Sequence, residues 1–134
     1  MDAIAIVQSF VDRINHHDVS GLCKLMSDDH IFVDPLGTVL QGKEEMRKAW
    51  IQYFFFFPDY SLQTMNIMES DGIVGLFGKA SGTYSDNGKM LKENRWDIPA
   101  SAKAVVRNNV VAEWHVFADN EPLRQIMEKY SSPQ

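Results

Sequence analysis

Asp34 is the strongest candidate in this sequence for proton-transfer chemistry. It follows a run of alternating residues and begins the string Asp34-Pro35-Leu36-Gly37. Alternation places its side chain on the same strand face as Phe32, where aromatic neighbours would desolvate the carboxylate and make it a better proton acceptor. An aspartate before Pro-x-Gly is also a common start of a turn. Two roles therefore stay open for Asp34, a general base that faces a pocket or the first residue of a turn.

Large aromatic and apolar side chains could form the walls of a pocket around this carboxylate. For any one such residue, plain packing in the core is the commoner role. Tyr53 differs from the others because it could add a hydroxyl to the pocket. The candidate lining residues are Phe10, Ile14, Phe32, Trp50, Tyr53, Phe57, Trp96, Trp114 and Val116.

His115 directly follows Trp114 on a predicted strand, so the two side chains point to opposite faces of the sheet. If Trp114 faces inward, His115 lies on the outer face, where a contact between two copies is its expected role. A register shift of one residue would reverse this assignment.

Metal and cofactor motifs are not predicted. The acidic and histidine residues at 16–18 and 28–30 have no recognised ligand spacing. The sequence also lacks a phosphate-binding glycine loop, a serine nucleophile motif and a dinucleotide-binding motif. We therefore expect a site without metal or cofactor.

Hydrophobic periodicity predicts an α+β fold in the order α-α-β-β-α-β-β-β-β-α. The chain is expected to form a single domain over residues 1–134, in which a strongly curved, mixed or antiparallel sheet wraps around helices and leaves a cone-shaped space. Gly75, Gly78 and Gly82 favour this bending, and Pro99 is expected to interrupt one strand. Helices are predicted at about 3–15, 18–26 and 43–57 and after 119, and strands at about 30–34, 38–40, 60–69, 73–85, 90–98, 102–106 and 110–118.

Composition disfavours nucleic acid and anionic membranes as partners. The 134 residues carry a formal net charge of -5, and their 13 basic residues are scattered. Cys23 is the one cysteine, so an internal disulfide is impossible. The first residues lack the pattern of a signal peptide, and no apolar stretch reaches membrane-spanning length. These features predict a cytoplasmic protein.

Three strings of the sequence resemble the nuclear-transport-factor-2-like (NTF2-like) superfamily, in particular its SnoaL-like polyketide cyclase and ketosteroid isomerase branch. The first is Phe10-Val11-Asp12-Arg13-Ile14-Asn15-His16-His17-Asp18, together with the stretch from Leu25 to Gly37. The second is Gly42 with Met46-Arg47 and Trp50. The third is Glu113-Trp114-His115-Val116-Phe117-Ala118-Asp119-Asn120. The resemblance implies a cone-shaped fold, a small-molecule pocket and a homodimer. It does not imply one activity, because this fold hosts enzymes, binders and transport factors.

The resemblance implies that Asp34 is the general base, because ketosteroid isomerases place theirs in the same Asp-Pro-x-Gly turn. Their tyrosine donor matches Phe10, and their carboxylic acid donor falls near Ser101 to Lys103, where no carboxyl stands. The steroid-type oxyanion donors are therefore expected to be absent. The catalytic aspartate of limonene epoxide hydrolases matches Val116, which disfavours that reaction as well.

Three functions stay open from the sequence. The first is cofactor-independent proton transfer on a small apolar carbonyl compound, as an isomerase or cyclase with Asp34 as base. The second is ligand binding without chemistry, and the third is an interaction module in which the outer sheet faces of two copies meet. The third is compatible with either of the other two.

Overall fold

The computed structural model describes residues 2–131, and its helices and strands follow the predicted order. Each predicted element is present, and most bounds agree to within a residue or two. The elements are α1 (Ala3–Asn15), α2 (Val19–Lys24), β1 (Met26–Val33), β2 (Val39–Gln41), α3 (Lys43–Phe56), β3 (Ser61–Ser70), β4 (Ile73–Asp86), β5 (Lys89–Arg107), β6 (Val110–Ala118) and α4 (Glu121–Ser131).

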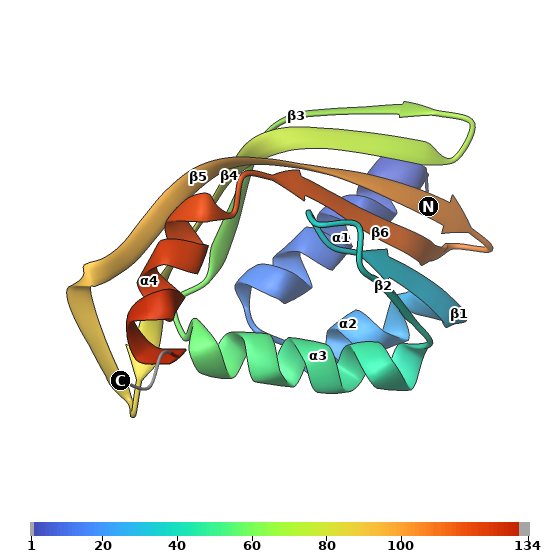
Figure 1. The fold of residues 1–134 in the computed structure, drawn as a ribbon. Coiled ribbons are helices and arrows are strands. Elements are labelled where there is room, and N and C mark those ends of the chain that lie inside the picture. The colour runs from blue at the N-terminus through green and yellow to red at the C-terminus, as the bar shows by residue number, and fades with distance from the viewer. Residues whose placement is uncertain (1, 132–134) are drawn as a thin grey trace.

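One mixed sheet of six strands organises the described chain. Its strand order is β2-β1-β6-β5-β4-β3. β1 runs parallel to β6, and the other neighbouring strands pair antiparallel. The sheet arches over α1, α2 and α3, which lie on its concave side (Figure 1). The predicted curved α+β sheet around helices is confirmed.

The first helix is held against the sheet by both its apolar face and its last residue. The Asp2 carboxylate caps the helix by accepting a hydrogen bond from the backbone N–H of Ala5 at 2.8 Å. Ile6, Phe10 and Ile14 are buried at helical spacing. The Asn15 amide then donates to the Leu62 carbonyl at 2.9 Å and accepts from the Leu62 N–H at 2.7 Å. These paired bonds fix the end of α1 against β3.

The predicted break of the fifth strand at Pro99 is wrong. β5 is continuous from Lys89 to Arg107, and Pro99 pairs with Lys79 of β4. β6 pairs with β5 only as far as Ala100. Pro99 therefore lies where one side of β5 has no neighbouring strand, and a proline without an N–H is tolerated at such an edge.

The start of the first strand also differs from the prediction. The sequence pattern places residues 27–29 between a helix and a strand, but β1 already begins at Met26, which pairs with Val111. The pairing is irregular between Met26 and Ile31. A polar stretch can be part of a strand here because its backbone, not its side chains, forms the ladder.

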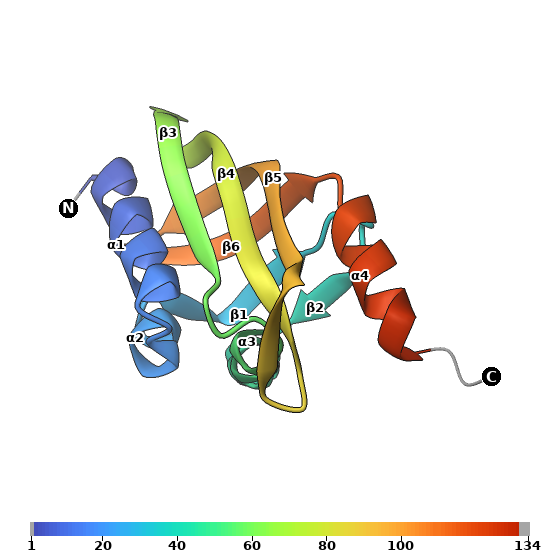
Figure 2. The same cartoon turned by 90° about the vertical axis from the view of Figure 1, so that its left-hand side faces the viewer.

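Small residues on the concave face of β5 leave space beneath the sheet. Ala100, Ala102 and Ala104 are buried and alternate with outward-facing residues. Figure 2 shows α1 and α4 on opposite sides of the bent strands, with α3 closing the cone from below. The space between them is bounded by short side chains above and by α3 below. No helix among the described residues is long and apolar enough to span a bilayer.

Candidate functional site

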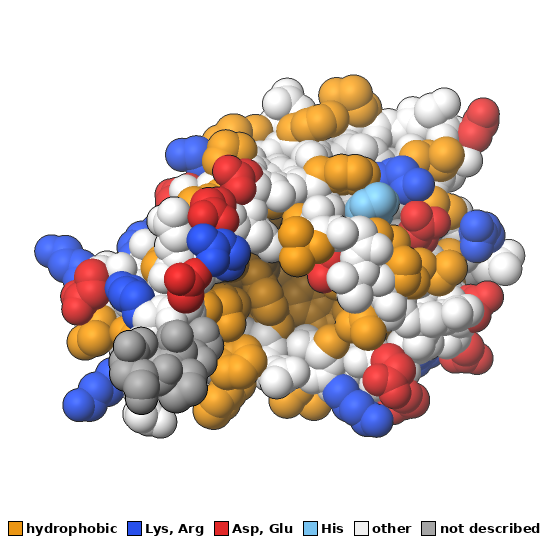
Figure 3. Space-filling model, viewed as in Figure 1, with side chains coloured by type: hydrophobic (Ala, Val, Ile, Leu, Met, Phe, Trp, Pro, Cys, Tyr) orange, Lys and Arg blue, Asp and Glu red, His pale blue; other side chains and the backbone are white. Residues whose placement is uncertain are grey.

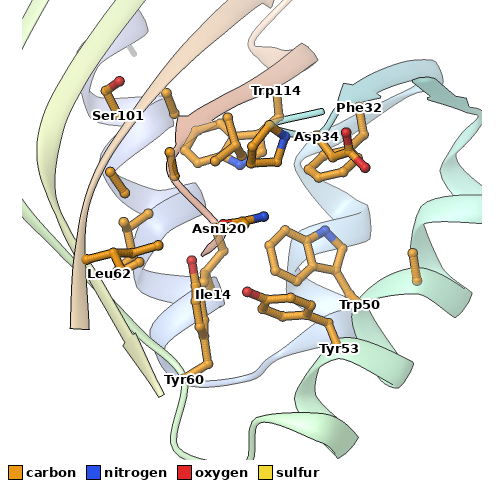
Figure 4. Close-up of a pocket in the computed structure, with 18 of the residues that line it drawn as sticks. Ile14, Phe32, Asp34, Trp50, Tyr53, Tyr60, Leu62, Ser101, Trp114 and Asn120 are labelled. Atoms are coloured by element: carbon orange, nitrogen blue, oxygen red, sulfur yellow. The ribbon is translucent and has the colours of Figure 1, made fainter. Parts of the chain in front are cut away.

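A cavity of about 270 Å³ lies between the concave face of the sheet and α3. Its hydrophobic lining is visible as a hollow in the surface (Figure 3), and its walls are drawn in Figure 4. The lining comes from α1, α3, five strands and three connecting segments. The residues are Ile14, Phe32, Asp34, Pro35, Met46, Ala49, Trp50, Tyr53, Tyr60, Leu62, Ala80, Trp96, Ile98, Ala100, Ser101, Ala102, Trp114, Val116, Ala118 and Asn120.

Most of the predicted lining residues reach this cavity, and two do not. Ile14, Phe32, Trp50, Tyr53, Trp96, Trp114 and Val116 are in the wall. Phe10 is completely buried behind Trp114, with ring centroids 4.9 Å apart. Phe57 is buried behind Trp96, with centroids 5.4 Å apart. Phe10 and Phe57 thus form a second layer that supports the tryptophans of the wall, so their predicted place in the lining is wrong.

Three polar lining residues, Tyr60, Ser101 and Asn120, are not among those predicted from the sequence. Tyr60 stands just before β3, and Asn120 stands between β6 and α4. Tyr60 could have been found from strand alternation, because it lies two residues before the inward-facing Leu62. Asn120 gives no such signal, because it lies outside a regular element. Ser101 also touches the cavity, but its hydroxyl points away from the other labelled side chains (Figure 4).

Asp34 forms the predicted turn and also lines the cavity. One carboxylate oxygen, Oδ1, accepts hydrogen bonds from the backbone N–H groups of Leu36 and Thr38, each at 2.9 Å. The Asp34 carbonyl accepts from the Gly37 N–H at 2.9 Å, which closes the turn. The side chain is only partly buried, and it lies beside Phe32 at one end of the cavity (Figure 4). The turn therefore fixes the orientation of a carboxylate in the cavity wall.

Two tyrosine hydroxyls lie in the cavity away from Asp34. Tyr53 comes from α3 and Tyr60 from the segment after it, and their rings meet edge to face with centroids 5.0 Å apart. In Figure 4 both hydroxyls point into the space near Asn120. Burial raises the pKa of Tyr53 well above its ordinary value, and burial raises the pKa of Tyr60 as well. Both phenols therefore stay protonated at neutral pH and can donate hydrogen bonds.

Two of the three tryptophans in the wall have indole N–H groups that are closed off from the open space of the cavity. The tryptophans of the chain, Trp50, Trp96 and Trp114, all line the cavity. The Nε1 atoms of Trp50 and Trp96 are buried and have no hydrogen-bond partner among the described residues. Because an indole nitrogen can only donate, each is a donor without an acceptor.

The four histidines have structural partners or face away from the cavity. His30 is fully buried, and its Nδ1 lies 2.7 Å from the Val111 carbonyl. His16 and His17 contact the backbone carbonyls of Asp12 and Tyr60. His115 stacks on Phe117 at 4.1 Å, opposite the inward-facing Trp114, as predicted. Within residues 2–131, no cluster of three or more His, Cys, Asp or Glu side chains could hold a metal ion.

Comparison with known proteins identifies the family. The SnoaL-like domain family matches residues 7–125, most of the chain. No protein of curated function matches the sequence.

Three solved structures share the fold across nearly all of both chains. A protein from Shewanella denitrificans, provisionally named a SnoaL-like polyketide cyclase, has a TM-score of 0.81 at 13% identity and covers 95% of this chain and 97% of its own. IdmH from Streptomyces antibioticus, provisionally named a polyketide cyclase, has a TM-score of 0.79 at 18% identity, with 96% and 99% covered. A protein from Catenulispora acidiphila with a ketosteroid isomerase-like fold, in complex with trimethylamine, has a TM-score of 0.79 at 12% identity, with 96% and 97% covered.

At these identities the structural neighbours establish the fold and not the activity. The family match covers both the turn that carries Asp34 and the strand that carries Trp114. The chain therefore belongs to the SnoaL-like domain family and adopts the NTF2-like fold.

Proposed function

We propose that this protein binds a small, largely apolar carbonyl compound and moves a proton on it without a cofactor, with Asp34 as general base. The observation that carries the proposal is the position of the Asp34 carboxylate, which lines an otherwise mostly apolar cavity and is oriented by two backbone N–H groups. A fixed carboxylate beside a bound apolar molecule can remove a proton from carbon next to a carbonyl.

The proposed reaction begins with removal of a proton from carbon and formation of an enolate. Asp34 takes a proton from the carbon next to the ligand's carbonyl, and the electron pair of that C–H bond forms an enolate whose negative charge rests on oxygen. In an isomerisation, the protonated Asp34 returns the proton to another carbon of the same molecule. In a cyclisation, the enolate carbon instead attacks an electrophilic carbonyl carbon of that molecule, and Asp34 protonates the new alkoxide.

The size of the cavity limits the ligand. Its volume of about 270 Å³ lies just below the usual range for drug-sized ligands, about 300–1,000 Å³. A compound of one or two fused rings fits such a space. The provisional cyclase names of two structural neighbours support the same class of carbonyl chemistry.

Hydrogen–deuterium exchange at carbon tests this proposal even though the natural substrate is unidentified. The purified protein is incubated in D₂O with 1-indanone, a two-ring ketone, and deuterium uptake next to the carbonyl is followed by NMR. We expect exchange above the buffer rate, and a drop of about 100-fold or more in Asp34→Asn, because a general base typically contributes 10²–10⁴-fold. Asparagine keeps an oxygen that can accept from Leu36 and Thr38, so the turn is preserved.

Equal exchange by the wild type and Asp34→Asn would refute the role of Asp34. Binding of the ketone without any exchange would instead favour a non-catalytic ligand-binding protein. That alternative has a specific observation behind it, because the hydrogen bonds that Asp34 makes to Leu36, Gly37 and Thr38 all serve its own turn.

A second proposal concerns the convex face of the sheet, which we expect to join two copies of the chain. Phe77 on β4 and Phe117 on β6 are about half exposed there. Both are paired with Ser101 of β5, the strand between them, so the three residues lie in one row across the sheet. Met68 lies on the next strand of the same face and is also exposed. Exposed apolar side chains grouped in this way are typical of protein interfaces.

A further inference from the structure

Hydrogen-bond donors without acceptors are concentrated in the cavity wall. The hydroxyls of Tyr53 and Tyr60 have no hydrogen-bond partner among the described residues, and the same holds for the indole N–H groups of Trp50 and Trp96. The two indole nitrogens are closed off from the open space of the cavity, whereas the two tyrosine hydroxyls point into it (Figure 4). A buried donor without an acceptor is costly and calls for a partner.

Acceptors in the same wall are few and lie apart. Asp34 is at one end of the cavity, and Tyr60 is at the other end (Figure 4). Asn120 offers one amide oxygen near the tyrosines, and its own N–H₂ group adds further donors. A ligand that satisfies both tyrosine hydroxyls therefore brings an acceptor to the tyrosine end.

We infer that the ligand is a ketone or quinone whose carbonyl oxygen is bound by the hydroxyls of Tyr53 and Tyr60. Two O–H donors from different elements can meet the two lone pairs of one carbonyl oxygen. An alcohol or an amine would bring a donor hydrogen of its own, which competes with the two hydroxyls for the few acceptors at this end of the cavity. A hydrocarbon would leave both hydroxyls unsatisfied. If Asp34 removes a proton, the same two donors stabilise the oxygen on which charge develops.

This inference rests on the proposed function for the site, but not on catalysis by Asp34. It also identifies two hydrogen-bond donors for the ligand's carbonyl oxygen. The positions that match the donors of ketosteroid isomerases, Phe10 and the stretch 101–103, cannot supply the expected tyrosine and carboxylic acid. Tyr53 and Tyr60 come from α3 and the segment before β3, so they approach the ligand from a different wall than Phe10, which lies behind Trp114.

Binding of three matched two-ring probes tests the inference. 1-Indanone carries a carbonyl, 1-indanol a hydroxyl, and indane neither. Protein labelled with ¹⁵N at the indole nitrogens gives three NMR signals, all from the cavity wall, whose shifts on titration report the dissociation constants. We expect indanone to bind the wild type most tightly.

Removal of each hydroxyl should selectively weaken the ketone. Tyr53→Phe and Tyr60→Phe each should lower the affinity for indanone about fivefold, the worth of an ordinary hydrogen bond, and leave indane unchanged. With ¹³C-labelled indanone, the bound carbonyl resonance should move to lower frequency in both variants, because a carbonyl that loses a hydrogen bond is less polarised. Tyr84→Phe is the matched control, since Tyr84 is partly buried and lies outside the lining.

Several results would overturn the inference. These are tighter binding of indanol than of indanone, equal losses for indanone and indane in the tyrosine variants, an unmoved carbonyl resonance, or no saturable binding of indanone. If one tyrosine variant fails to fold, the carbonyl resonance in the other variant, compared with the wild type and Tyr84→Phe, still tests the inference. Asp34→Asn should leave the bound carbonyl resonance unchanged, so failure of the proposed catalysis and failure of this inference are distinguishable.

Discussion

At the scale of the residue, β1 positions two side chains with different surroundings: Asp34, which lines the cavity, and His30, which is buried in the core. Asp34 follows β1 and faces the cavity, where its turn holds it. His30 lies earlier on β1 and is completely buried. Its Nδ1 faces a carbonyl, which can only accept, so Nδ1 carries the hydrogen and Nε2 is bare in the neutral ring. Nε2 has no partner among the described residues.

The buried state of His30 predicts a pH-dependent stability. Burial lowers its pKa, and the hydrogen bond to Val111 opposes this only in part. The unfolded chain therefore binds more protons than the folded one below the ordinary histidine value of about 6.5. The free energy of unfolding should be constant above that pH and should fall as the pH drops below it, by at most about 1.4 kcal/mol per pH unit from this group.

Urea unfolding between pH 8 and pH 5 measures this dependence. His30→Gln should have a flatter profile than the wild type, although its stability at pH 8 is lower. His16→Gln, at an exposed helix end, is the control and should keep the wild-type slope. A wild-type slope retained in His30→Gln would show that another group is responsible.

At the scale of the element, β4 lies unusually close to the backbone of β3 at one glycine. The pairing of β3 with β4 shifts between Thr64 and Asn66, which marks a bulge. Gly78 pairs with Thr64 at this place, and a Cβ on Gly78 would overlap the backbone carbonyl of Gln63. Farther along β4, Gly82 leaves room for the ring of Trp96, which lines the cavity. The absence of a side chain at Gly78 thus allows the close approach of β3, and its absence at Gly82 allows the Trp96 ring to take its place in the cavity wall.

Substitution of glycine by alanine in β4 should lower stability strongly at one position and hardly at all at another. Gly78→Ala should lower the free energy of unfolding by about 3 kcal/mol, because backbone cannot move aside as a flexible side chain can. Gly75→Ala should change it by no more than about 0.5 kcal/mol, since its new Cβ would meet only the Phe77 ring at an ordinary 3.9 Å. Urea unfolding compares the two, and equal effects would contradict the close approach at Gly78.

At the scale of the whole molecule, the two faces of the sheet have different chemistry. The concave face closes over the cavity, and the convex face exposes apolar side chains, which also appear over the strands in Figure 3. His115 stacks on Phe117 on this convex face, and Lys103 forms an ion pair with Glu113 at 3.3 Å. We expect the convex faces of two copies of the chain to pack against each other. The cavities lie on the concave side of each sheet, so both should stay accessible to ligand.

Sedimentation velocity tests this assembly. The wild type should sediment as a dimer, and Phe77→Lys should shift it toward the monomer, because a charge would be buried without a partner in the apolar contact. Ile51→Lys is the matched control, since Ile51 is similarly exposed on α3, away from the convex face. A monomeric wild type, or a dimer that persists in Phe77→Lys, would contradict the proposed interface.

The sequence by itself determined the element order, the direction of most side chains and the Asp34 turn. These features depend on near neighbours in the chain. Helical and strand periodicity fix which way a side chain points, and Asp-Pro-Leu-Gly contains the atoms of its own turn. For the same reason, alternation correctly placed Trp114 and His115 on opposite faces of the sheet.

The tertiary structure alone decided how deep each inward residue lies. Phe10 and Phe57 point inward yet stand behind Trp114 and Trp96, whereas Tyr60 and Asn120 reach the cavity from connecting segments. Periodicity gives the direction of a side chain but not the distance across the fold. That distance depends on how far the sheet bends and on which segments the bend brings together, and these are set by packing between residues far apart in the chain.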